Sequence, residues 1–217
     1  AIAFNTGNLL LANGSDLIVT AAGGAVTMLA IRGNSSEDVT LTSTGGDTNT
    51  ISVGAIGNAD EINTVALTAT GGITLNGDIT TSNAIGNTVT ITGPVTLGAA
   101  VTIDTDAAAN DGKIDFEGAT STINGGQTLS LQAGSADIDV GGIIGGTTAV
   151  TSLDFDGATI TILDIGDADT VGVTGATDIN AATRLIFAGT TYKANQQTYT
   201  APAEQNFLIN GGAATTF

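Results

Sequence analysis

Apolar residues alternate with threonine and serine in short runs along most of the chain, and the runs end at glycine, asparagine or aspartate. The pattern is clearest at 39–44, 65–70, 89–92, 101–104 and 129–132. Alternation with a period of two over four to six residues is typical of a β-strand with one buried face. The sequence therefore predicts an all-β protein built from many short strands.

The apolar residues of these runs predict the interior. Aromatic residues make up only 4% of the chain and tryptophan is absent, so the core must be built from valine, isoleucine, leucine and alanine. Small branched side chains fit a narrow interior in which equivalent positions stack on one another, whereas a wide sandwich core usually contains larger rings. The residues predicted to face inward are Leu41, Ile51, Val53, Leu67, Leu75, Ile91, Leu97, Ile103, Leu129, Leu131, Ile138, Val140, Leu153 and Phe155.

An internal repeat relates residues 39–69 to residues 129–155, each with a strand, a glycine corner, a polar segment and further short strands. Matched strands are separated by roughly 20 to 26 residues, which is the range of solenoid coils. We predict a parallel β-helix, or β-solenoid, of roughly ten coils. Tandem β-sandwich domains are the alternative.

The end of the chain differs in composition. Five of the eight aromatic residues lie within 187–217, so we divide the chain into a repetitive solenoid (1–186) and an aromatic-richer terminal segment (187–217). A solenoid exposes unpaired strand edges at both ends, and such edges are templates for further strands. We predict head-to-tail assembly through apolar residues near the two ends, namely Ile2, Phe4, Leu10, Tyr192, Tyr199, Phe207 and Phe217.

The charge balance limits the partners. The chain has 21 acidic and four basic residues and a net charge of −17, so it lacks the basic surface that nucleic acids require. No run of 18 apolar residues predicts a membrane span. Cysteine and histidine are both absent, which removes thiolate metal sites and the usual nucleophile–histidine pairs.

Carboxylates are the remaining candidates for chemistry. The densest acidic patch contains Asp104, Asp106 and Asp111, and calcium is the cofactor that it would bind, although the spacing does not fit an EF-hand loop. A carboxylate pair of a carbohydrate-active enzyme could come from 137/139 or from 154/156, but a basic or aromatic sugar-binding surround is missing. We therefore predict that the protein is not an enzyme.

Threonines separated by one residue occur in several strands. Rows of such pairs on a flat β-helix face can match ice, but threonine is also a common outward residue of ordinary strands. Because the coils vary in length, we interpret the pairs as ordinary outward residues. They are Thr40 and Thr42, Thr68 and Thr70, Thr88, Thr90 and Thr92, and Thr159 and Thr161.

Residues 114–155 resemble the repeats of giant bacterial surface exoproteins of the filamentous-haemagglutinin-like and autotransporter-like kind. The phrases that carry the resemblance are Gly-Gly-Gln-Thr-Leu-Ser-Leu at 125–131 and Gly-Gly-Thr-Thr-Ala-Val-Thr-Ser-Leu at 145–153. The resemblance implies a secreted, right-handed parallel β-helix without catalytic residues.

Together these observations predict a non-enzymatic, extracellular structural or adhesive protein of a prokaryotic cell surface, a β-solenoid stalk or filament-forming module. Its expected partners are further copies of itself, other parts of a longer chain, or host or surface glycans. The alternative is an S-layer or cation-linked surface filament subunit made of β-sandwich domains. A carbohydrate-active β-helix enzyme is a lesser alternative.

Overall fold

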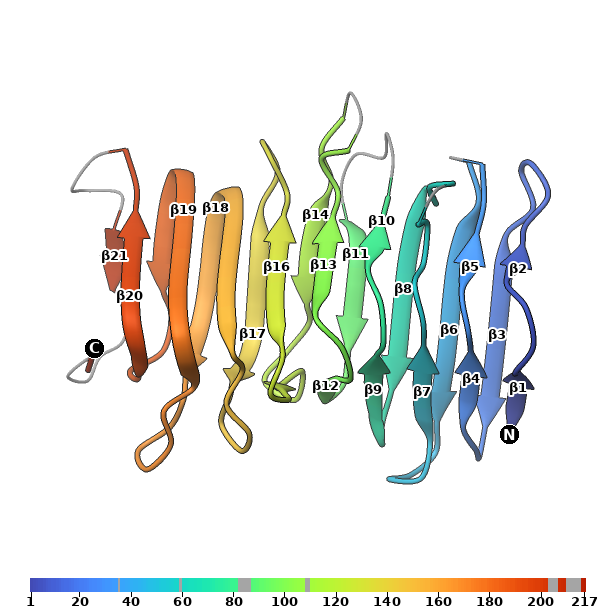
Figure 1. The fold of residues 1–217 in the computed structure, drawn as a ribbon, viewed down its shortest axis with the longest axis horizontal. Helices are drawn as coiled ribbons and strands as arrows, with labels where there is room; N and C mark the ends of the chain where they lie inside the picture. Colours follow the sequence, from blue (N-terminus) through green and yellow to red (C-terminus); the bar gives the residue numbers. More distant parts are fainter. Residues whose placement is uncertain (35, 59, 82–86, 108–109, 203–206, 210–215) are drawn as a thin grey trace.

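The computed structural model describes residues 1–34, 36–58, 60–81, 87–107, 110–202, 207–209 and 216–217. Within these residues the chain forms only strands, turns and bends, and every strand pairing is parallel. The strands stack into a β-solenoid of about eight turns (Figure 1). The all-β, parallel β-helix prediction is confirmed, and tandem sandwiches are not what the chain forms.

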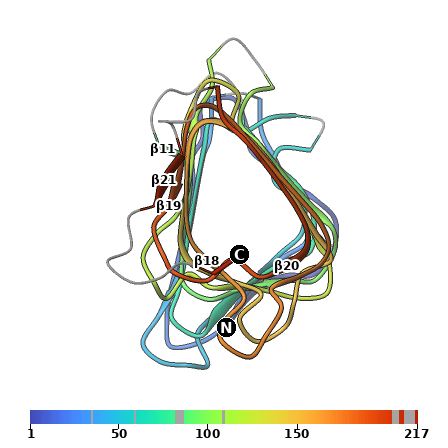
Figure 2. The ribbon, with the colours of Figure 1, turned by 90° about the vertical axis from the view of Figure 1, so that its left-hand side faces the viewer.

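Each turn contributes strands to three columns, which enclose a triangular interior (Figure 2). The first column contains β1 (Ile2–Phe4), β4 (Val26–Met28), β7 (Thr50–Val53), β9 (Gly72–Leu75), β12 (Val95–Leu97) and β15 (Ile123–Asn124). The second contains β2 (Leu9–Leu10), β5 (Ile31–Arg32), β10 (Ile79–Thr80), β13 (Val101–Asp104), β16 (Thr128–Gln132) and β20 (Ala194–Thr200). The third contains β3 (Leu17–Ala22), β6 (Asp38–Thr44), β8 (Thr64–Ala69), β11 (Asn87–Thr92), β14 (Lys113–Phe116), β17 (Ile138–Ile144) and β21 (Phe207–Ile209).

Two long strands turn a corner of the triangle. Both β18 (Ser152–Ile165) and β19 (Val173–Phe187) begin in the second column and continue into the third. The ends of β17 and β18 also reach the first column, where Ile144 pairs with Ile123 and with Ile165. Seen from the C-terminal end, the chain runs counter-clockwise as it approaches the viewer (Figure 2). The solenoid is therefore right-handed.

The length of a turn can be followed along the third column. Equivalent positions are 22 residues apart at the shortest, from Leu17 to Val39, and 26 at the longest, from Val39 to Val65. Apart from irregularities such as the one between Asn87 and Val89, the strands stay in register, so most of this variation falls in the connections at the corners. Turns of this length give about eight levels, fewer than the roughly ten coils that the sequence predicted.

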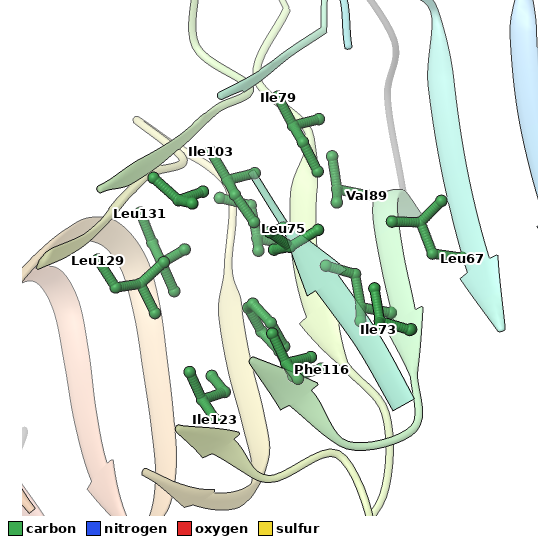
Figure 3. Packing of buried hydrophobic residues seen from close by; sticks show 14 of the residues in the cluster. Leu67, Ile73, Leu75, Ile79, Val89, Ile103, Phe116, Ile123, Leu129 and Leu131 are labelled. Atoms are coloured by element: carbon green, nitrogen blue, oxygen red, sulfur yellow. The ribbon is translucent and has the colours of Figure 1, made fainter. Parts of the chain in front are cut away.

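Stacked aliphatic side chains fill the interior. All fourteen residues predicted to face inward are buried, and side chains from the three columns point toward one another (Figure 3). The rare aromatic residues Phe116 and Phe155 occupy the same ladders as the aliphatic ones and are fully buried. Each added turn thus extends the core lengthwise without widening it.

The internal repeat found in the sequence does not mark equivalent positions of the solenoid. Residues 39–44 lie in the third column, whereas their sequence counterparts at 129–132 lie in the second. Similar sequences therefore occur on different faces, because every face of the solenoid requires the same alternation of apolar and polar residues.

The columns continue into the aromatic-richer segment, since β20 and β21 both pair with β19. The division of the chain at residue 187 stays a prediction. No helix long and apolar enough to cross a membrane occurs in the described part of the chain.

The orientation of the strands is tested by a pair of neighbouring substitutions in β8. Leu67 is fully buried, whereas Thr68 points outward. We expect Leu67→Asp to lower the free energy of unfolding by about 4 kcal/mol or more, because it buries an unpaired charge. Thr68→Asp should cost less than about 1 kcal/mol. Urea unfolding followed by circular dichroism measures both values, and similar losses for the two variants would show that the assigned inward face is wrong.

Candidate functional site

Many acidic residues lie at the corners and bind the next turn. Their carboxylates accept hydrogen bonds from backbone N–H groups that are about one turn further along the chain. The pairs are Asp16 with Asp38 at 3.0 Å, Asp78 with Thr102 at 2.8 Å, Asp137 with Thr159 at 2.9 Å and Asp164 with Thr190 at 2.8 Å. Because a corner leaves N–H groups outside the regular ladder, these carboxylates satisfy donors that the sheets leave free.

The three residues predicted to bind calcium lie at one such corner. Asp104 ends β13, and Asp106 and Asp111 belong to the connection from β13 to β14. The Asp106 N–H donates to Asp104 Oδ1 at 3.1 Å. Asp111 Oδ2 accepts a hydrogen bond from the Ser135 N–H at 2.6 Å, and its bonding to Ser135 lowers the pKa of Asp111.

Asp106 is crowded by negative charge. Its hydrogen bond with the Asp104 side chain, its partial burial and the charges of Asp104, Asp111 and Asp156 together raise the pKa of Asp106 to about 6. Asp156 lies two turns further along the solenoid than Asp104. Gln132 pairs with both of them from the turn in between. The structure therefore brings the three predicted residues together and adds Asp156, which the sequence analysis did not connect with them.

Proximity alone does not make this corner a metal site. No three acidic side chains in the described part of the chain converge in a way that could hold a metal ion. The oxygens of Asp104 and Asp111 already accept hydrogen bonds from the chain itself. Calcium binding at residues 104, 106 and 111 stays a prediction.

Replacing Asp106 tests this electrostatic description. An unfolded aspartate titrates near 3.8, whereas Asp106 titrates near 6 in the folded chain. Ionised Asp106 therefore destabilises the fold above about pH 6, and this cost disappears as the pH falls below about 4. We expect Asp106→Asn to raise the melting temperature at about pH 7.5 and to change it little at about pH 3.5.

Thermal unfolding followed by circular dichroism measures these shifts. Asp47→Asn is the matched control, because it removes one charge from an exposed position. Equal shifts for the two variants at pH 7.5 would contradict the assignment. In the same assay, a saturable gain specific to calcium at matched ionic strength, abolished by Asp104→Asn and by Asp106→Asn, would establish the calcium site.

Three of the four carboxylates considered for catalysis have structural partners. Asp139 forms an ion pair with Lys113 at 2.6 Å, and Asp137 accepts a hydrogen bond from the Thr159 N–H. Asp156 accepts a hydrogen bond from the Asn180 amide at 2.9 Å, and Asp154 lies exposed on the outer wall. This arrangement fits outward carboxylates with structural roles, and it does not favour the carbohydrate-active enzyme.

Two shallow depressions lie on the described part of the wall, and no carboxylate is among their described lining residues. One, of about 220 Å³, is lined by Asn8, Ala30, Arg32, Ala55 and Asn58. The other, of about 250 Å³, lies at a corner and is lined by Thr68, Ala69, Thr70, Thr92, Gly93, Pro94 and Thr120. The Arg32 guanidinium is paired with Asp60.

Lys113 bridges two stacked carboxylates of the third column. Asp115 and Asp139 are direct neighbours on successive turns, and Lys113 Nζ lies 2.8 Å from Asp115 and 2.6 Å from Asp139. Burial alone would lower the pKa of Lys113, but the two carboxylates together raise it. Lys113 thus neutralises a repulsion that the register of the strands creates.

Glu37 is a buried carboxylate that the sequence analysis missed. It lies just before β6 and accepts hydrogen bonds from the N–H of Asn34, the N–H of Gly14 at 2.9 Å, and the N–H and hydroxyl of Ser36 at 3.3 and 3.2 Å. The bond from Asn34 has the largest effect, and the hydrogen bonds together outweigh burial and lower the pKa of Glu37 to about 2. Because Gly14 belongs to the preceding turn, Glu37 ties two corner loops together.

The charge of Glu37 should stabilise the fold. Since the pKa falls from 4.5 to about 2 on folding, this stabilisation is present above about pH 4.5 and is lost as the pH falls toward 2. We expect Glu37→Gln to lower the melting temperature at neutral pH, with the difference from the native chain shrinking below pH 4.5. Melting curves between pH 2 and pH 7 measure this, with Asp47→Asn as the exposed control. A difference that does not change with pH would contradict the role of the charge.

The first turn forms one end of the described core. Ile2 and Phe4 pair with inward residues of β4 and so face the interior, and Phe4 is 42% exposed. Leu10, predicted to assemble with them, pairs with Arg32 on the outer wall and is 67% exposed. The structure therefore places Ile2 and Phe4, but not Leu10, at the end of the core.

Aromatic rings fill the interior at the other end. The ring of Phe187 lies 4.8 Å from that of Tyr192 and 5.1 Å from those of Tyr199 and Phe217, in edge-to-face contacts, and Tyr192 stacks on Phe217 at 5.3 Å. Phe217 is 53% exposed. Phe207 begins β21, but its side chain lies outside the described residues.

Tyr192 is buried by this cluster and anchors it. Its hydroxyl accepts a hydrogen bond from the Gly189 N–H at 2.9 Å and lies 2.8 Å from the Leu163 carbonyl oxygen, to which it donates. Burial raises the pKa of Tyr192. Of the aromatic residues predicted to assemble, Tyr192 is thus an interior residue and Phe217 presents a ring to solvent.

No family model, curated protein or solved structure matches the chain. The class that the fold defines is a parallel β-solenoid of stacked repeats, and this fold is compatible with a repetitive surface protein. The resemblance to bacterial surface exoproteins has no further support from homologues.

Proposed function

We propose that the chain is a non-enzymatic structural or adhesive module of a prokaryotic cell surface, a β-solenoid stalk that extends by stacking further solenoid turns on its ends. The observation that carries this proposal is the unbroken ladder. The inward positions of the third column follow one another from β3 to β19 around a single buried core.

This architecture provides length at constant width. Each turn contacts only its neighbours, so the stability of the rod is approximately a sum over turns and interfaces between turns. Adjacent turns are separated by about 4.8 Å. A stalk needs this property, whereas an enzyme needs a concave site.

Both ends suit continued stacking. The first turn presents Ile2 and Phe4, and the last presents the partly exposed ring of Phe217. Beside these apolar surfaces, the outer edges of β1, β2 and β3 pair with no other strand among the described residues, and such edges are templates for pairing. The first turn of a second copy would continue the second column above β20 and the third above β21. Such a head-to-tail contact generates an open filament unless the rotation closes a ring.

The composition supports the remaining parts of the proposal. A net charge of −17 makes copies repel one another side to side, which favours growth along the axis over lateral aggregation. Extracellular location and attachment to surface glycans are proposed on the repeat resemblance and this composition.

Assembly through the ends is tested by placing charges on the exposed rings. We expect the native chain to form filaments with a 4.8 Å axial repeat in fibre diffraction, and Phe4→Glu or Phe217→Glu to give monomers in sedimentation. Val171→Glu is the matched control: Val171 is 41% exposed, close to the 42% of Phe4, but it lies in the connection that leads into β19.

The control should assemble like the native chain. A native chain that stays monomeric at every concentration, or a Phe4→Glu variant that forms unchanged filaments, would rule out the first turn as a joint between copies. Antibody labelling of intact cells of the source organism tests the surface location separately.

A further inference from the structure

A broad straight part of the wall is formed by β3, β6, β8 and β11. These strands are six, seven, six and six residues long, whereas those of the first column have two to four residues. They lie side by side in Figure 1 and form a straight side of the triangle in Figure 2. We call their outward residues the threonine face: Ile18, Thr20, Thr40, Thr42, Ala66, Thr68, Thr90 and Thr92.

The threonine face consists of two parallel rows in register. In one row Thr20, Thr42, Thr68 and Thr92 follow one another on four successive turns. The other row, two residues earlier in each strand, contains Ile18, Thr40, Ala66 and Thr90. The spacing of 22, 26 and 24 residues between the threonines of the first row is absorbed by the corners. The variation in coil length, which spoke against an ordered array in the sequence, therefore leaves the array intact.

The hydroxyl groups of this face are free for an external partner. Within the described part of the chain, Thr20, Thr40, Thr42, Thr68 and Thr90 make no side-chain hydrogen bond, and only Thr92 does so, to Glu117 at 3.0 Å. Outward residues elsewhere bond to each other, as Thr128 does with Ser152 and Asn180 with Asp156.

The face is also neutral in a strongly acidic protein. Neither row contains a charged residue over these four turns. Charged residues lie at its borders: Asp38 on one edge, and on the next turn Glu117, which is bonded to Thr92, and the ion cluster of Lys113, Asp115 and Asp139. A neutral face of hydroxyl and methyl groups does not select a charged partner. It suits a partner whose own surface is a regular array of hydrogen-bonding groups.

The repeat of the rows is close to a spacing of ice. Two water molecules that hydrogen-bond to the same tetrahedral water at 2.7–2.8 Å lie about 4.5 Å apart. Threonines on successive turns lie about 4.8 Å apart, so the mismatch over three steps is only about 1 Å. Threonine is stiff at χ1, so ordering its hydroxyls on a lattice loses little rotamer freedom. We propose that the threonine face binds the surface of ice.

The proposal is tested by ice-affinity uptake, in which the fraction of protein incorporated into a slowly growing ice surface is measured. We expect the native chain to be enriched in the ice, and Thr42→Lys and Thr68→Lys to fall to the level of a protein that does not bind ice. Each lysine places a long charged side chain in the middle of the array. Circular dichroism and sedimentation establish that the variants keep the fold and assembly state of the native chain.

Thr74→Lys is the matched control, because it makes the same change at an outward position of β9, in the first column. It should bind ice like the native chain. The proposal would be overturned by any of three results: the native chain is excluded from ice, the Thr68→Lys variant still binds ice, or Thr74→Lys loses as much ice binding as Thr68→Lys does. Binding to insoluble crystalline cellulose without binding to ice would overturn it too, and would assign the face to a polysaccharide.

Discussion

Strands inside the solenoid, such as β8 and β13, hydrogen-bond in parallel to the strand one turn before them and to the strand one turn after them. A one-residue slip in any turn would move a whole row of side chains between the interior and the solvent. The pairing therefore fixes more than the backbone. Inside, it aligns Val39, Val65 and Val89 in one row. Outside, it aligns Thr42, Thr68 and Thr92 in another. Both the core and the surface therefore consist of rows of like residues.

Stacking like on like is favourable for aliphatic residues and costly for charged ones. The chain resolves the cost in two ways. Lys113 lies between the stacked carboxylates of Asp115 and Asp139, and corner carboxylates such as Asp78 and Asp137 bind N–H groups of the following turn. Much of the acidic composition thus has a structural role at the corners. At Asp106 the neighbouring negative charges are not fully compensated, and the pKa of Asp106 is raised as a result.

The sequence was sufficient to predict the features that depend on local alternation. The inward positions from Leu41 to Phe155 and the parallel β-helix followed from a period of two and a repeat of 20 to 26 residues. Features that depend on which residues meet across turns could not be predicted in this way. The approach of Asp156 to Asp106, and of Gly14 to Glu37, depends on the lengths of the intervening corners. The phrases at 39–44 and 129–132 look alike but lie on different faces, because alternation alone does not identify a column.

The two termini lie at opposite ends of the rod (Figure 1), so tension between them acts along the axis. The hydrogen bonds between turns run in the same direction, and the turns carry the force in series. Because each turn contacts only its neighbours, we expect such a rod to come apart one turn at a time. A released turn of 22 to 26 residues lengthens the chain by about 80 Å when it is fully extended. We therefore expect the molecule to lengthen under tension in many small steps, each of which lowers the load on the turns that remain.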